Sequence, residues 1–116
     1  MSELQKENLI INLTLEFAIE AVKYCDISEE KRKFVISRQL LRSATSIGAS
    51  IREAQNAESK PDLIHKFKIA AKEAEETEYW LLICKNSTGY PNPETLMLKL
   101  KSIQKVINRI IASSKQ

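Results

Sequence analysis

Apolar side chains recur every three or four positions along this chain, and this period constrains its fold more than any other feature. An α-helix has 3.6 residues per turn, so such spacing lines the apolar residues along one side of a helix. We call each such line of side chains a seam. The three clearest seams are Leu40, Ala44, Ile47, Ile51 and Ala54; Leu63, Phe67, Ala70, Ala74, Thr77, Leu81 and Cys84; and Leu96, Leu100, Ile103, Ile107 and Ile110. Each seam predicts a helix that buries one face.

Capping residues and prolines divide the chain into four predicted helices. These signals are a capping box at Ser2–Gln5, Asp26 and Ser28, Ser59 with Pro61, and Asn92 with Pro93. The predicted helices cover about 3–25, 29–58, 60–86 and 93–113. Short connections make sequence neighbours antiparallel, so we predict one all-α domain over 1–116, an antiparallel up-down-up-down four-helix bundle.

The composition agrees with a helical protein that has no membrane segment. Only two glycines and three prolines are available for turns. No apolar run is long enough to span a bilayer, and the first residues do not resemble a signal peptide. We therefore expect a cytoplasmic protein in which Cys25 and Cys84 are reduced thiols.

Residues with catalytic or metal-binding chemistry are scarce. His65 is the only histidine, and Asp62 lies three residues before it. A di-metal site in a helical bundle needs two such carboxylate–histidine pairs and further carboxylates, so we expect no metal and no cofactor. A lone histidine also gives no nucleophile–base arrangement, so the sequence does not predict an enzyme.

Charge is segregated along the chain, although the net charge is only +3. Residues 31–52 carry six bases and no acids, and 95–116 carry five bases and no acids. The candidate nucleic-acid contacts are Arg38, Arg42 and Arg52, with Lys99, Lys101, Lys105 and Arg109 as a second patch. Such cations can contact phosphates. The alternative is that basic helices simply pair with acidic neighbours within the bundle.

The first predicted helix carries two apolar stripes where a lone bundle needs one. One stripe is Leu9, Leu13, Phe17 and Tyr24, and the other is Ile11, Leu15, Ala18 and Val22. Tyr79 and Ile83 also point away from the seam of the third helix. An apolar surface of this size indicates a subunit interface of Ile11, Leu15, Val22, Tyr79 and Ile83 in a homo-oligomer. An unusually wide core within one chain is the alternative.

Four stretches carry a resemblance to a known family. They are Ser46–Ala54, Ala57–Ser59, Asp62–Phe67 and Ala70–Leu81. In these stretches the chain resembles the bacterial four-helix-bundle proteins, also called 23S rRNA intervening-sequence proteins. The family usually has Asn-Ile-Ala-Glu in the second helix; this chain has Ser50-Ile51-Arg52-Glu53, so the isoleucine and glutamate carry over and the asparagine does not.

The resemblance implies a left-handed bundle without enzymatic activity that assembles as a ring, typically a homopentamer. It also implies a relationship to the basic, RNA-engaging accessory variability proteins of diversity-generating retroelements. Two hypotheses follow from the residues and the resemblance together. In the first, the oligomer binds nucleic acid, namely RNA, through a basic face. In the second, it is an adaptor or scaffold that binds another protein.

Overall fold

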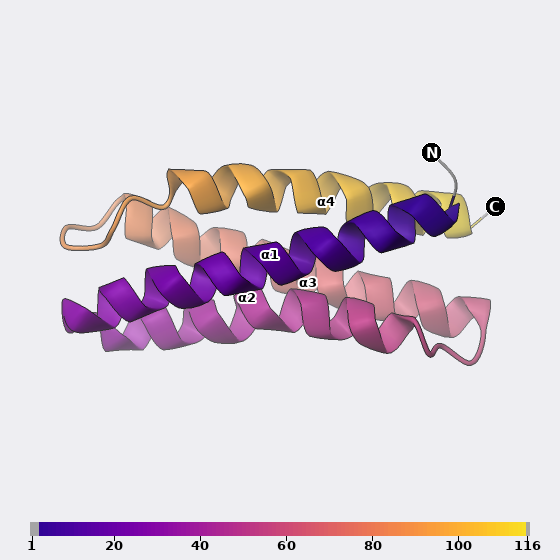
Figure 1. The fold of residues 1–116 in the computed structure, drawn as a ribbon, viewed down its shortest axis with the longest axis horizontal. Coiled ribbons are helices and arrows are strands. Elements are labelled where there is room, and N and C mark those ends of the chain that lie inside the picture. The colour runs from indigo at the N-terminus through magenta and orange to yellow at the C-terminus, as the bar shows by residue number, and fades with distance from the viewer. Residues whose placement is uncertain (1–2, 116) are drawn as a thin grey trace.

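The computed structural model describes residues 3–115 as four α-helices with short connections (Figure 1). The helices are α1 (Glu3–Glu30), α2 (Phe34–Ala54), α3 (Lys60–Lys85) and α4 (Glu94–Ser114). Successive helices run in opposite directions, and the start of α1 lies at the same end of the bundle as the end of α4. Residues 3–115 contain no strand. The predicted all-α, up-down-up-down bundle is confirmed.

The bundle is elongated, with extents of 46 × 23 × 19 Å. Each helix packs against two neighbours, α1 and α3 both contacting α2 and α4. Small residues line the contact between α2 and α3, where Ala44 and Ala74 are completely buried. In the same contact the Thr77 hydroxyl donates a hydrogen bond to Ser43 Oγ at 2.8 Å. The first and third helices are therefore diagonal to each other, as are the second and fourth.

The three predicted seams form most of the core. Every seam residue of α2 and α4 is buried, and in α3 only Leu63 is partly exposed. The prediction for α1 was less accurate. Phe17 and Tyr24 are buried as expected, but the fully buried positions also include Ile10 and Ala21, whereas Leu13 is half-buried. The core face of α1 is thus rotated slightly from the predicted stripe.

The first helix continues beyond its predicted end at residue 25. Asp26 and Ser28 do not cap the second helix, because both lie inside α1. The Ser28 hydroxyl donates to the Tyr24 carbonyl oxygen at 3.0 Å, a bond within the helix. Lys33 is the residue before α2, and its side chain makes no capping bond. The predicted boundary was wrong because a serine can also lie inside a helix, where its hydroxyl donates to the carbonyl four residues earlier.

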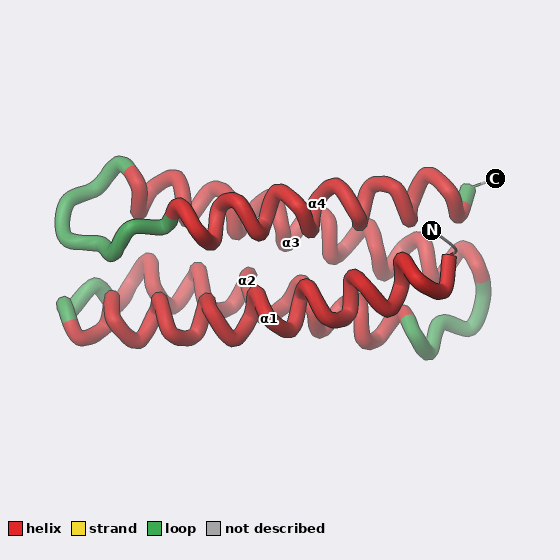
Figure 2. The backbone as a smooth tube through the Cα atoms, turned by 45° about the horizontal axis from the view of Figure 1, so that its top comes forward, coloured by secondary structure: helices red, strands yellow, loops and turns green. Residues whose placement is uncertain are grey.

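The end of α1 is a Schellman motif, the two-bond turn that commonly terminates helices. The Lys33 N–H donates to the Ser28 carbonyl at 2.9 Å, and the Arg32 N–H donates to the Glu29 carbonyl at 2.8 Å. The turn requires a left-handed backbone at Arg32, whose φ is 63°. Glycine usually occupies this position because it has no Cβ to clash. Figure 2 shows the turn as a short connection between α1 and α2.

The other boundaries agree with the prediction to within a few residues. The second helix ends at Ala54 rather than 58. Ser59 caps α3 as predicted, accepting a hydrogen bond from the Asp62 N–H at 3.2 Å. Asn92 Oδ1 accepts from the Glu94 N–H at 3.0 Å where α4 begins. The predicted capping box at Ser2 starts outside the described residues.

Candidate nucleic-acid interface

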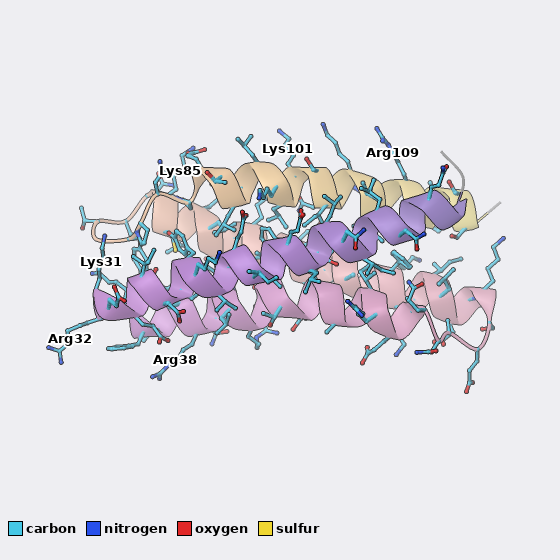
Figure 3. The ribbon with its side chains drawn as sticks, viewed as in Figure 1. Lys31, Arg32, Arg38, Lys85, Lys101 and Arg109 are labelled. Atoms are coloured by element: carbon cyan, nitrogen blue, oxygen red, sulfur yellow. The ribbon has the colours of Figure 1, made fainter. Side chains whose placement is uncertain are left out.

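Three cations form a row on the outer face of α4. Lys101, Lys105 and Arg109 are exposed and follow one another at intervals of four residues, which is close to one helical turn. Beyond Glu94, α4 carries no acid. Lys101 and Arg109 both project from the same edge of the bundle in Figure 3. Within residues 3–115 none of the three has an ion-pair partner.

Lys99, predicted in the same patch, does not belong to this row. Two residues along a helix correspond to about 200°, so Lys99 points away from Lys101. Its ammonium donates to Glu20 Oε1 on α1 at 2.6 Å. This ion pair joins the basic fourth helix to the acidic first helix, as the alternative interpretation of the charge pattern expected.

The three arginines of α2 do not form a single surface. Arg38 is exposed near the start of the helix, and Arg52 is exposed in its last turn. The two residues are 14 positions apart, which corresponds to roughly 21 Å along the helix axis. Figure 3 shows Arg38 on the side of the bundle away from Lys101 and Arg109, so the two predicted patches lie on different sides.

Arg42 is held by the neighbouring helix. Its guanidinium binds Glu73 Oε2 at 3.3 Å and makes a second, closer ion pair with Glu76. Glu76 also accepts a hydrogen bond from the Trp80 indole N–H at 2.9 Å. The hydrogen bonds that Glu76 accepts from Trp80 and Arg42 lower the pKa of Glu76. The hydrogen bond between Arg42 and Glu76 also raises the pKa of Arg42. Arg42 therefore pairs with carboxylates of α3 across the contact between the two helices, and it would have to exchange these partners to bind a phosphate.

An exposed apolar ridge runs along α1. Leu15, Ile19 and Val22 are 48%, 48% and 41% exposed. Their spacing of four and three residues places them on one face of the helix. Ile11, predicted in the same interface, instead packs against the core. We call Leu15, Ile19 and Val22 the α1 ridge.

A second exposed apolar surface lies across α3 and α4. Tyr79, Leu82 and Leu98 are 59%, 43% and 69% exposed, whereas Ile83 is half-buried. Beside them is an open groove of about 250 Å³ whose lining includes Met97 and Leu98. We call Tyr79, Leu82 and Leu98 the α3–α4 patch. The sequence indicated Tyr79 but not Leu98, which stands alone among polar residues of α4.

The ridge and the patch lie at the same height on different sides of the bundle. Tyr24 and Cys25 of α1 lie near Cys84 of α3 across the core, so these residues are at a similar height along the bundle. Both helices run in the same direction. Ile19 is five residues before Tyr24, and Tyr79 is five residues before Cys84, so the two side chains are level.

The buried polar cluster around the cysteines is structural. Burial raises the pKa of Cys25 to about 12 and also raises the pKa of Cys84. Both thiols are free. The Tyr24 hydroxyl donates to the Pro91 carbonyl at 2.6 Å, which anchors the loop between α3 and α4 to α1. A protonated thiol is a poor nucleophile, so this cluster does not provide a reactive cysteine.

The remaining candidate residues do not form a reactive site. His65 is exposed, and Asp62 takes part in the capping contacts at the start of α3. Of the family-like residues of α2, Ile51 is completely buried and Glu53 is exposed. Among the described residues no group of histidine, cysteine, aspartate or glutamate could hold a metal ion. None of the helices, searched over the same residues, is long and apolar enough to cross a membrane.

Comparison with known proteins shows similarity to one family and to solved structures. A crystal structure of a protein of unknown function from the S23 ribosomal protein family of Bacteroides thetaiotaomicron VPI-5482 superposes with a TM-score of 0.83. The two chains are 44% identical over 92% of this chain and 98% of that one. No curated protein matches. Residues 6–112 match the family described as 23S rRNA-intervening sequence protein, and the chain therefore belongs to that family.

Proposed function

We propose that this protein is a non-enzymatic, homo-oligomeric bundle of the cytoplasm that binds RNA through the outer face of α4. The observation that carries the proposal is the row of Lys101, Lys105 and Arg109, which is exposed and lacks ion-pair partners within residues 3–115. Exposed cations at regular spacing can neutralise successive phosphates and release their counterions. The other predicted cations contribute less, because Lys99 and Arg42 are bound by carboxylates.

Self-association would repeat this row. The α1 ridge and the α3–α4 patch are both exposed and apolar. Because the two surfaces are level and lie on different sides, the ridge of one copy can pack against Tyr79, Leu82 and Leu98 of the next with the bundle axes parallel, which leaves the outer face of α4 to the RNA. A head-to-tail contact of this kind closes into a ring when the rotation permits. The family resemblance favours five copies.

An oligomer also explains how three cations per chain would suffice for binding. Three phosphate contacts give a modest affinity that salt weakens readily. Several rows held on one particle can engage the same RNA, and each further contact is then intramolecular. Avidity is therefore a property of the whole assembly, in which each α4 contributes one weak RNA-binding surface.

The direct test is neutralisation of the row. The variant Lys101→Gln, Lys105→Gln, Arg109→Gln should lose most of its affinity for a duplex RNA in fluorescence anisotropy and should keep its helical circular dichroism. A matched control carries Lys23→Gln, Lys68→Gln and Lys72→Gln. These three lysines are also exposed, and the control has the same net charge as the first variant. We expect the control to bind nearly as well as the unaltered protein.

Two results would overturn the proposal. Equal losses in the two variants would show that net charge alone matters and that α4 is not the interface. No salt-sensitive binding by the unaltered protein would leave the adaptor hypothesis, in which the oligomer presents its surfaces to another protein.

A further inference from the structure

The α1–α2 turn gathers cations beside an exposed aromatic ring. Lys31 and Arg32 are exposed in the turn, and Arg38 is exposed on the following turn of α2. Figure 3 shows Lys31 and Arg32 at the left end of the bundle and Arg38 projecting from its lower edge near that end. Phe34 and Val35 lie between them and are 40% and 76% exposed. We call Lys31–Phe34 together with Arg38 the α1–α2 tip, which leaves out the neighbouring Val35.

Aromatic rings and cations are paired at this end. The Arg38 guanidinium carbon lies 5.5 Å from the centre of the Phe34 ring. The Lys33 ammonium lies 5.7 Å from the centre of the Tyr90 ring, on the loop before α4. The sequence alone shows no aromatic residues interleaved among the arginines of α2, but folding places Arg38 over Phe34. An aromatic face with an adjacent guanidinium is a stacking surface for an unpaired base.

Arg32 occupies a position that favours glycine. It has the left-handed backbone of the Schellman turn, with φ of 63°. A non-glycine residue there has a higher conformational energy than glycine would. Attraction to the negative end of the α1 dipole explains a nearby positive charge, but Lys31 and Lys33 already supply it. A strained residue whose exposed cation has no ion-pair partner within residues 3–115 points to a role for the side chain itself.

The charges at the tip favour contact with a few nucleotides over contact with a long duplex. Asp26, Glu29 and Glu30 lie on the last turns of α1 and offset much of the positive charge. Charge alone would therefore hold a duplex weakly at this end. Stacking adds affinity only where a base is unpaired, because a duplex keeps its base faces covered.

We propose that the α1–α2 tip binds single-stranded nucleic acid, with an unpaired base against Phe34 and Arg38 and the flanking phosphates at Lys31 and Arg32. The inference rests on the proposed RNA-binding function and adds the kind of RNA: a duplex region on α4 would be accompanied by an unpaired segment at the tip. The tip and the α4 row are separate surfaces, so each can be altered alone.

The first test uses a short oligouridylate and a duplex RNA of the same length as anisotropy probes. Phe34→Leu keeps an apolar side chain but removes the ring, and it should weaken oligouridylate binding roughly tenfold. Duplex binding should stay unchanged. The matched control is Val35→Ala, the adjacent exposed apolar residue, which should bind both probes as the unaltered protein does. The proposal would be overturned if Phe34→Leu bound oligouridylate as well as the unaltered protein does, or if it lost equal affinity for both probes.

A second variant separates function from folding. Arg32→Gly places the favoured residue in the left-handed turn, so its Tm should rise by a few degrees. The same variant should bind oligouridylate more weakly because a phosphate contact is lost. A more stable protein with unchanged affinity would show that Arg32 has no binding role and would contradict the proposal.

The outcomes also distinguish the two proposals from each other. If neither probe binds the unaltered protein, both proposals fail. If neutralising the α4 row abolishes binding while Phe34→Leu has no effect, the α4 proposal stands and the tip proposal is wrong.

Discussion

Gly48 lies where α2 crosses α1, and the Thr14 side chain occupies the space that a larger residue would need. A Cβ at this position would be 3.3 Å from both Thr14 Cβ and Thr14 Oγ1. We predict that Gly48→Leu destabilises the protein by about 1–3 kcal/mol, because the helices cannot separate locally without losing packing. Urea unfolding measures the change. Ala49→Leu, at the exposed neighbouring position, is the control, and an equal effect there would contradict the close crossing.

The buried thiols make stability depend on pH in the alkaline range. Folding raises the pKa of Cys25 from 9.0 to about 12, so the folded state keeps the thiol protonated while the unfolded chain releases the proton. The stabilisation is complete below the unfolded pKa and is lost as pH rises toward 12. The urea concentration at the unfolding midpoint should therefore decrease as the pH rises from about 8 to about 11. A protein with both Cys25→Ala and Cys84→Ala should lose less stability over that pH interval. An identical loss of stability would exclude the thiols as the cause of the pH dependence.

At the scale of elements, Tyr24 connects α1 to the loop before α4. Its hydroxyl donates to the Pro91 carbonyl at 2.6 Å from a nearly buried ring. Tyr24→Phe should cost about 1 kcal/mol, because one buried carbonyl loses its partner. Hydrogen exchange should accelerate mainly in residues 86–93. Tyr79→Phe is the control, since that hydroxyl is on the exposed α3–α4 patch, and uniform acceleration through the bundle would argue against a local anchor.

The helix seams could be predicted because each repeats one physical requirement many times. Every position from Leu40 to Ala54 in the α2 seam is buried as the period indicated. Helix ends depend on one or two hydrogen bonds, which the period does not contain. Ser28 was expected to cap a helix and instead bonds within one. Arg32 then ends that helix in a turn that normally takes glycine, a signal the sequence does not carry.

The candidate site was harder to predict because residues that are distant in the sequence decide whether each cation is paired with a carboxylate. Arg42 looked free along α2, and only the fold shows that Glu73 and Glu76 bind it from α3. Lys99 is likewise paired with Glu20, which is 79 positions away. Lys101 and Arg109 were correctly expected on the surface. The α1 ridge was indicated by its excess of apolar residues, although Ile11 turned inward to the core.

At the scale of the whole molecule, the exposed apolar surfaces predict self-association. Light scattering at micromolar concentration should give a mass of several chains, five if the family resemblance holds. Leu15→Glu should dissociate the assembly without unfolding the subunit, because Leu15 is 48% exposed in the single chain. Val35→Glu is the control, an exposed apolar residue outside the α1 ridge and the α3–α4 patch. A single-chain mass for the unaltered protein would contradict the contact between the α1 ridge and the α3–α4 patch.

The salt dependence of RNA binding tests the central claim most directly. Three phosphate contacts by Lys101, Lys105 and Arg109 correspond to roughly a 40-fold loss of affinity per chain between about 50 and 200 mM salt. The account predicts at least this loss for the unaltered protein, and a clearly flatter dependence when the three residues are changed to glutamine. Affinity that does not vary with salt, or a slope that the triple substitution leaves unchanged, would contradict RNA binding through α4.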